Sequence, residues 1–174
     1  MYKRQAYNRD GDEIYTVILN STTTDQRFTD TATLAKWYYD HKVTVAIANT
    51  QEKTANGNPL MARISQTDWT DKTIDATLAD PTAQATVFSL AGEVTEKVSY
   101  DDLSGTVHVG DKVGSVTLKQ DGTKIAVVDL VADEEGSGPN PIEWLLVKLD
   151  RLGRRIDNRP LTVESETVAK APEV

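Results

Sequence analysis

Residues 43 to 132 carry apolar side chains at every second position in a series of short runs, and this alternation is the feature that most limits the fold. The first run is Val43, Val45 and Ile47, and similar runs follow at 60–64, 74–78, 86–90, 94–100 and 113–118. Turn-forming residues such as Asn56-Gly57-Asn58-Pro59 separate them. Many short strands with one apolar face each are typical of a β-sandwich or a small barrel. We therefore expect a β-sandwich domain over residues 42–132, in a chain that is mainly β.

The dipeptide Asp121-Gly122 predicts a tight hairpin between two of these strands. A two-residue Asp-Gly loop suits a type I′ turn, because both central residues need positive φ. Extending the pairing outward from the turn places Leu118 opposite Ile125 on the apolar face. Beyond Val127 the apolar positions change parity, which predicts a β-bulge near that residue.

The chain before this domain reads like the end of a different one. Glu13–Asn20 is rich in β-branched and aromatic residues, and its nearly continuous apolar run indicates a strand that is covered on both faces. A helix is predicted next, with Asp25 as a plausible N-cap and apolar residues at helical spacing as far as Tyr38. One strand and one helix do not make a domain. We expect residues 6–41 to be the C-terminal remnant of an α/β domain.

The first five residues have a possible origin outside the protein. Met1-Tyr2-Lys3-Arg4-Gln5 is the translation of ATG-TAT-AAG-AGA-CAG, which resembles the end of a transposase sequencing adapter. We therefore expect residues 1–5 to be an artefact that should be set aside before the fold is considered. A genuine polar N-terminus is the alternative.

Three segments are predicted after the β-domain. Residues 133–140 are acidic and rich in glycine and proline, which is typical of a linker. Residues 141–156 have the pattern of a short amphipathic helix, capped by Asn140 and started by Pro141. Residues 157–174 show little periodicity, so we expect a disordered tail.

The predicted helix at 141–156 is the candidate binding site of the chain. Its apolar residues form one stripe, made of Ile142, Leu145, Leu146, Leu149, Leu152 and Ile156. Its basic residues lie outside this stripe and are Lys148, Arg151, Arg154 and Arg155. A short, basic, amphipathic helix suits an anionic membrane surface. The alternative is that the stripe packs on the protein's own sheet.

Composition and residue spacing argue against several other classes of partner and of chemistry. A net charge of −8 disfavours nucleic acid as a partner, because phosphate binding needs a basic surface. The absence of cysteine from the sequence excludes disulfides and thiolate chemistry. The histidines, His41 and His108, are far apart, and no phosphate loop or metal-ligand spacing occurs. We expect no catalytic residue, cofactor or metal in this chain.

Two blocks of sequence resemble a known family. Val17–Asn20, Arg27–Thr31 and Leu34–Tyr38 are similar to the closing strand and helix of serine-type D-alanyl-D-alanine carboxypeptidases, the low-molecular-mass penicillin-binding proteins. Gly110–Leu118 with Asp121-Gly122 is similar to a hairpin in that family's C-terminal β-domain. The second block also resembles lipoyl domains, but those carry a lysine at the hairpin tip.

The resemblance implies a function for a longer parent protein. The family's catalytic motifs S-x-x-K, S-x-N and K-T-G do not occur in this sequence, so the chain alone should be inactive. The parent would remove terminal D-alanine from peptidoglycan stem peptides, through a catalytic domain that this chain lacks. The resemblance also implies an extracytoplasmic protein, attached peripherally to the membrane, whose β-domain positions the catalytic domain or binds partners. The alternative is a stand-alone β-sandwich binding module without an enzyme parent.

Overall fold

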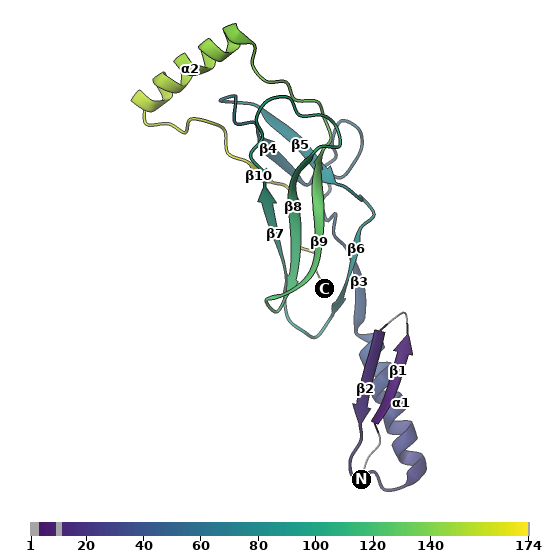
Figure 1. The fold of residues 1–174 in the computed structure, drawn as a ribbon. Helices are drawn as coiled ribbons and strands as arrows, with labels where there is room; N and C mark the ends of the chain where they lie inside the picture. The colour runs from purple at the N-terminus through teal and green to yellow at the C-terminus, as the bar shows by residue number, and fades with distance from the viewer. Residues whose placement is uncertain (1–3, 10–11, 174) are drawn as a thin grey trace. The chain divides into compact units, whose positions relative to one another are not determined.

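The computed structural model describes residues 4–9 and 12–173, which divide into two compact units (Figure 1). The first, called here the N-terminal unit, comprises the described residues up to Val43 together with Phe88–Leu90. The second, called here the β-domain, comprises Thr44–Val87 and the described residues from Ala91 onward. The expectation for residues 1–5 lies partly outside the described residues.

The N-terminal unit is a hairpin followed by a helix. Strand β1 (Arg4–Arg9) pairs antiparallel with β2 (Asp12–Val17), and helix α1 follows (Thr24–Asp40). The predicted cap is wrong by two residues. Thr23 caps α1 by accepting a hydrogen bond from the Gln26 N–H at 3.1 Å, and Asp25 lies in the first turn, where its charge suits the helix dipole.

The predicted strand is present, but its surroundings differ from the expectation. Of the β2 side chains only Thr16 is buried, whereas Tyr15 and Val17 on the other face are exposed. The described part of this chain therefore covers one face of the strand, and the cover expected for the other face is not supplied by it. The apolar run is real, but only one of its faces finds a partner within this unit.

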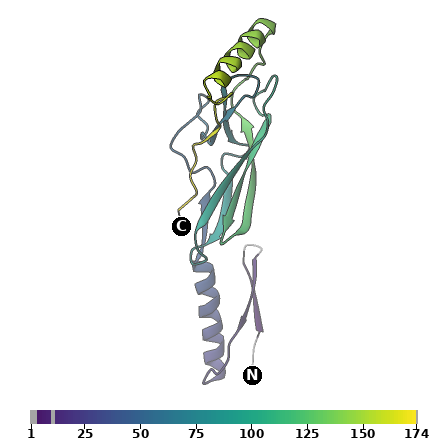
Figure 2. The same cartoon turned by 90° about the vertical axis from the view of Figure 1, so that its left-hand side faces the viewer.

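The β-domain contains the predicted succession of short strands. One sheet has the order β10-β4-β5-β9-β8-β7, and a second sheet pairs β3 with β6. The bounds are β3 Lys42–Ala46, β4 Ala62–Ser65, β5 Thr73–Leu78, β6 Gln84–Phe88, β7 Val94–Tyr100, β8 Lys112–Gln120, β9 Thr123–Ala132 and β10 Glu166–Thr167. Figure 2 shows the long β7, β8 and β9 strands running side by side.

One apolar core joins the two sheets of the β-domain. Val45 on β3 and Val87 on β6 belong to the same buried cluster as Leu118 on β8 and Leu130 on β9. These residues come from the alternating positions identified in the sequence, because successive side chains of a strand point to opposite faces. A β-sandwich-like domain is thereby confirmed.

The β8–β9 hairpin has the predicted turn and an earlier bulge. Asp121 and Gly122 have φ of 47° and 74°, as a type I′ turn requires. The register shifts directly after the Lys119–Lys124 pair, so Leu118 lies opposite Ala126 and not Ile125. The predicted bulge near Val127 is therefore misplaced. The earlier shift directs Leu130 and Ala132 into the core and leaves Val127 exposed.

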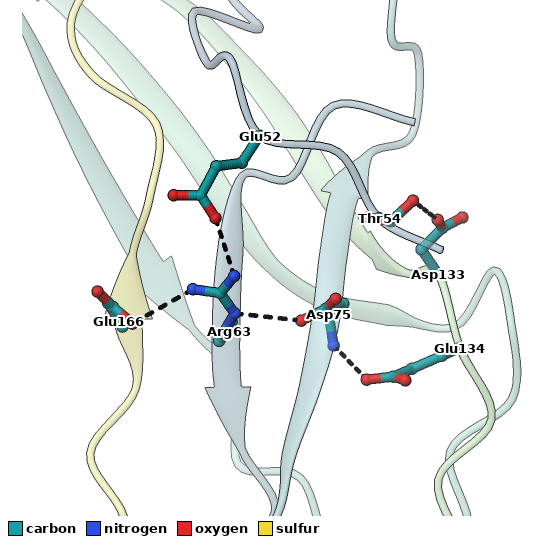
Figure 3. A network of polar contacts seen from close by, with 7 residues as sticks. All are labelled: Glu52, Thr54, Arg63, Asp75, Asp133, Glu134 and Glu166. Atoms are coloured by element: carbon teal, nitrogen blue, oxygen red, sulfur yellow. Dashed lines mark hydrogen bonds and ion pairs between the residues drawn. The ribbon is translucent and has the colours of Figure 1, made fainter. Parts of the chain in front are cut away.

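The segment 133–140 is not a free linker. Asp133 is buried, and its carboxylate accepts hydrogen bonds from the Thr54 hydroxyl and, at 2.8 Å, from the Asn58 amide. Figure 3 shows the contact with Thr54. Gly136 then pairs with Val107 through two backbone hydrogen bonds of 2.8 Å. The acidic residue that suggested solvent exposure is buried because the loop at 54–58 supplies its donors.

The expectation of a disordered tail is also wrong. Strand β10 pairs with β4, and the backbone N–H groups of Val168 and Ala169 donate to the Met61 carbonyl. Arg63 on β4 lies 3.5 Å from Glu166 of the tail and 2.9 Å from Glu52 (Figure 3). The tail is ordered because β4 offers it an open edge with unpaired backbone groups.

The tail also approaches the opposite edge of the sheet. The Tyr100 hydroxyl on β7 and the Thr167 hydroxyl on β10 share a hydrogen bond. These two strands are the outermost in the sheet order. A side-chain contact therefore links the two edges and bends the sheet toward a closed shape.

Candidate functional site

The two histidines lie in different surroundings and share no site. The His41 Nδ1 atom is 2.7 Å from the Trp37 carbonyl in the N-terminal unit. In the β-domain, His108 Nδ1 is 2.9 Å from the Glu135 carboxylate, and both side chains are exposed. Over residues 4–9 and 12–173, no cluster of three potential metal ligands occurs. The candidate binding surface of the chain is instead on its second helix.

Helix α2 (Pro141–Ile156) has the range predicted from the sequence. Its N-terminus is a capping box: the Asn140 side chain accepts from the Glu143 N–H at 2.9 Å, and the Glu143 carboxylate accepts from the Asn140 N–H at 2.9 Å. Arg154 and Arg155 in the last turn complement the helix dipole. These local interactions define the helix before any tertiary contact is considered.

The apolar stripe of α2 faces away from the protein. Its six residues, Ile142, Leu145, Leu146, Leu149, Leu152 and Ile156, are all more than half exposed, from 54% for Leu145 to 78% for Ile156. A stripe of this size normally covers a core. In the described part of the chain, no helix is long and apolar enough to cross a membrane.

The helix contacts its own domain through the opposite face. Val147 is the residue of α2 that is buried, and Arg151 lies one turn further along the same face. The Arg151 Nη2 atom donates to the backbone carbonyls of Thr67 and, at 3.3 Å, of Trp69. The alternative that the stripe packs on the protein's own sheet is therefore wrong.

Helix α2 docks on the loop at 66–72, which connects β4 to β5 and is held by hydrogen bonds of its own. Trp69 is buried, and its indole N–H donates to the Ser137 carbonyl at 2.9 Å. Gln66 donates to the Gly105 carbonyl at 2.8 Å. Sequence reasoning missed Trp69 and Val147 in this role, because no local pattern links the 66–70 turn to the helix.

The four basic candidates divide into two pairs. Arg151 and Arg154 contact other residues of the β-domain. Arg151 donates to the loop at 66–72. Arg154 donates to the Asp150 carboxylate at 2.7 Å, and this hydrogen bond lowers the pKa of that carboxyl. Lys148 and Arg155 are exposed, and the Lys148 ammonium lies 4.9 Å from the centre of the Trp144 ring. Of the four membrane-association candidates, Lys148 and Arg155 are therefore the pair whose charges are not used in hydrogen bonds or ion pairs with other described residues of the β-domain.

A groove runs along the basic flank of the stripe. It has a volume of about 310 Å³ and is lined by Lys148, Arg151, Leu152, Arg155 and Leu161. Leu161 was missed because it falls in the segment expected to be disordered. Leu152 belongs both to this groove and to the stripe, so the two features share an edge.

Comparison with known proteins points to one family. Residues 70–136 match the family profile described as penicillin-binding protein 5, C-terminal domain. No curated protein matches the chain significantly. Among solved structures, the D-alanyl-D-alanine carboxypeptidase DacD from Francisella tularensis has 15% identity and a TM-score of 0.43, with coverage of 79% of this chain and 33% of that one. For penicillin-binding protein 5 from Haemophilus influenzae the values are 14%, 0.43, 78% and 39%. The chain thus spans well under half of either protein.

Proposed function

We propose, from the membership of residues 70–136 in the penicillin-binding protein 5 C-terminal domain family, that this chain is the rear part of a D-alanyl-D-alanine carboxypeptidase and attaches it to a membrane surface. In this proposal the β-domain supports α2, and α2 is the part that contacts lipid. The parent enzyme would trim terminal D-alanine from peptidoglycan stem peptides outside the cytoplasm, with catalytic residues that lie elsewhere.

The observation that carries the proposal is the orientation of α2. Val147 and Arg151 attach the helix through the face opposite the stripe, so the stripe is exposed. Burying an exposed leucine in an apolar phase contributes on the order of 1 kcal/mol for the fraction still accessible here. Six such residues supply enough energy for interfacial binding after the loss of mobility is subtracted.

Charge supports the same orientation. The whole chain has a net charge of −8, yet in α2 the four basic residues outnumber the two acidic ones, Glu143 and Asp150. Anionic lipid therefore attracts this end of the molecule and repels the rest. The result is a defined approach of the β-domain to the membrane with α2 first.

Co-sedimentation with anionic vesicles tests the proposal. Leu145→Asp with Leu149→Asp should abolish the binding that the unaltered chain shows. The matched control is Val109→Asp with Val127→Asp, which changes two exposed apolar residues of the β-domain outside α2. Binding that survives the first pair, or that is absent at low salt for the unaltered chain, would refute attachment through α2.

A separate experiment addresses the catalytic part of the proposal. The chain lacks a serine nucleophile held next to a lysine in the family's motif, so no acyl-enzyme should form. Incubation with a fluorescent penicillin followed by a denaturing gel should give no labelled band. A band that unlabelled penicillin removes would show a nucleophile that the motif search missed. The alternative is a stand-alone binding module, and the genomic sequence upstream of codon 6 distinguishes the two. A reading frame that continues into K-T-G, S-x-N and S-x-x-K would support the carboxypeptidase parent, whereas a ribosome-binding site there would favour the module.

A further inference from the structure

We propose that the groove between α2 and Leu161 binds the phosphate of an anionic lipid headgroup, an inference that rests on the membrane attachment proposed above. The groove has three cationic residues in its lining, Lys148, Arg151 and Arg155, and no acidic one. Its volume of about 310 Å³ accommodates a phosphodiester with part of its glycerol. Charge complementarity therefore favours a compact anion.

The nearby acids do not neutralise this groove. Asp150 is bonded to Arg154 at 2.7 Å, and Asp157 is bonded to Arg159 at 2.6 Å. Among the described residues, neither Lys148 nor Arg155 forms an ion pair with a carboxylate. Lys148, whose ammonium lies 4.9 Å from the centre of the Trp144 ring, and Arg155 thus line the groove without a carboxylate partner, which leaves the positive charge of the groove for an external anion.

The three cations have different roles. Arg151 is fixed by the carbonyls of Thr67 and Trp69, so it contributes charge at a constant position. Lys148 and Arg155 are seven residues apart, or about 10 Å along the axis, and their side chains can converge on one phosphate between them. A guanidinium can bind two phosphate oxygens at once, whereas an ammonium acts as a point charge.

The position of the groove selects a lipid over free phosphate. Leu152 lines the groove and also belongs to the apolar stripe, and Leu161 adds a second apolar wall. When the stripe enters the acyl boundary, the groove lies at the depth of the headgroups. Free phosphate would leave these leucines uncovered, whereas the glycerol of a lipid covers them.

Two vesicle types with equal measured surface potential test the inference. One contains phosphatidylglycerol and the other contains oleate, whose carboxylate has the charge without the phosphate. The unaltered full chain should prefer phosphatidylglycerol by about tenfold, and Lys148→Gln with Arg155→Gln should remove this preference. Arg155→Lys, which keeps the charge, should reduce the preference several-fold. Lys97→Gln with Lys124→Gln, two exposed lysines of the β-sheet, is the matched control and should leave it unchanged.

Equal binding to both vesicle types would overturn the inference, because the surface would then recognise negative charge and not phosphate. A preference that persists in the double variant would also overturn it, because the phosphate would then be bound elsewhere. Circular dichroism of each variant confirms that α2 is still folded. If the unaltered chain binds no vesicle, membrane attachment itself is refuted, and soluble glycerophosphoglycerol then tests the groove independently. A chemical-shift change at the Arg155 side-chain N–H that the double variant abolishes supports the groove, and no change overturns it.

Discussion

The N-terminal unit and the β-domain distribute their apolar residues in opposite ways. Among the described side chains of the N-terminal unit, those that are buried are Thr16, Thr31 and Ala35, all small. Its large apolar residues, including Phe28 and Trp37, are about half exposed. The β-domain instead buries large side chains such as Leu118 and Leu130 in one cluster.

This difference indicates that the two units depend on their surroundings to different degrees. A domain is stable alone when it buries enough apolar area to offset the entropy of ordering its chain. The β-domain buries large apolar side chains of its own, whereas large apolar side chains of the N-terminal unit are exposed, so we expect the β-domain to be the more stable of the two when isolated. The helix α2 is a third case, because its exposed apolar residues are sorted into one stripe with cations beside it.

The largest effect should come from the polar network that closes the β-domain. Asp133→Ala removes the acceptor for the buried Thr54 hydroxyl and the half-buried Asn58 amide, which should lower the free energy of unfolding by about 3 kcal/mol. Urea denaturation at neutral pH measures this change. Glu134→Ala is the control: its carboxylate is exposed and accepts from the Asp75 N–H, so the loss should stay below about 1 kcal/mol. Equal losses would mean that the buried network is not what closes the domain.

The hairpin turn should give the next effect. Gly122 has φ of +74°, and open space surrounds the position that a Cβ would occupy. Gly122→Val should therefore destabilise the β-domain by about 2 kcal/mol through backbone strain alone. Thermal unfolding measures it against Gly153→Ala in α2, which should leave the β-domain unchanged. An unaffected midpoint for Gly122→Val would show that the turn can change type at little cost.

A smaller, pH-dependent effect should come from Glu96 on β7. Both of its carboxylate oxygens are buried without a hydrogen-bond partner in the described structure, and burial raises the pKa of this group from 4.5 to about 7. The folded state therefore holds the proton more tightly than the unfolded chain. The associated stability is fully present below about pH 4.5 and is lost as the pH rises through about 7.

Glu96→Gln tests this dependence. The variant should be more stable than the unaltered chain at pH 8, by about 1 kcal/mol after allowance for solvent screening, and equal to it at pH 4. Comparing the two proteins at each pH cancels the contribution of every other titrating group. A difference that does not vary with pH would show that the carboxyl gains solvent or a partner in solution.

The smallest effect on the β-domain should come from removing residues 1–41, which contain β1, β2 and α1 of the N-terminal unit. Deletion of residues 1–41 keeps β3 intact and should change the free energy of unfolding of the β-domain by less than about 0.5 kcal/mol. Solubility should rise, because the deletion removes the exposed apolar faces of β2 and α1. Unfolding of the remaining chain would show that the two units are not independent.

The sequence predicted the elements of this protein well and their partners poorly. Alternation identified the strands of the β-domain, and the Asp121-Gly122 turn was correct, because both signals are local. The bulge was misplaced because its position depends on which β9 residues reach the core. The tail and the 133–140 segment were misjudged for a related reason: β4 and the 54–58 loop order them, and composition does not reveal such distant partners.

The candidate site shows the same limit. Helical spacing identified the stripe and the basic residues of α2, but not the face by which the helix is held. Arg151 was grouped with Lys148 and Arg155, because all three are basic and lie outside the stripe. Only the contact with Thr67 and Trp69 separates a residue that holds the helix from residues that can reach a ligand.

The acceptors that Arg151 uses have a consequence for how this helix can evolve. Both are main-chain carbonyls, which every amino acid provides whatever its side chain. Positions 67 and 69 can therefore vary without losing the acceptors, provided that the loop keeps its course. At position 151 the side chain itself makes the contact, so a substitution there removes an attachment that substitutions at 67 and 69 leave in place.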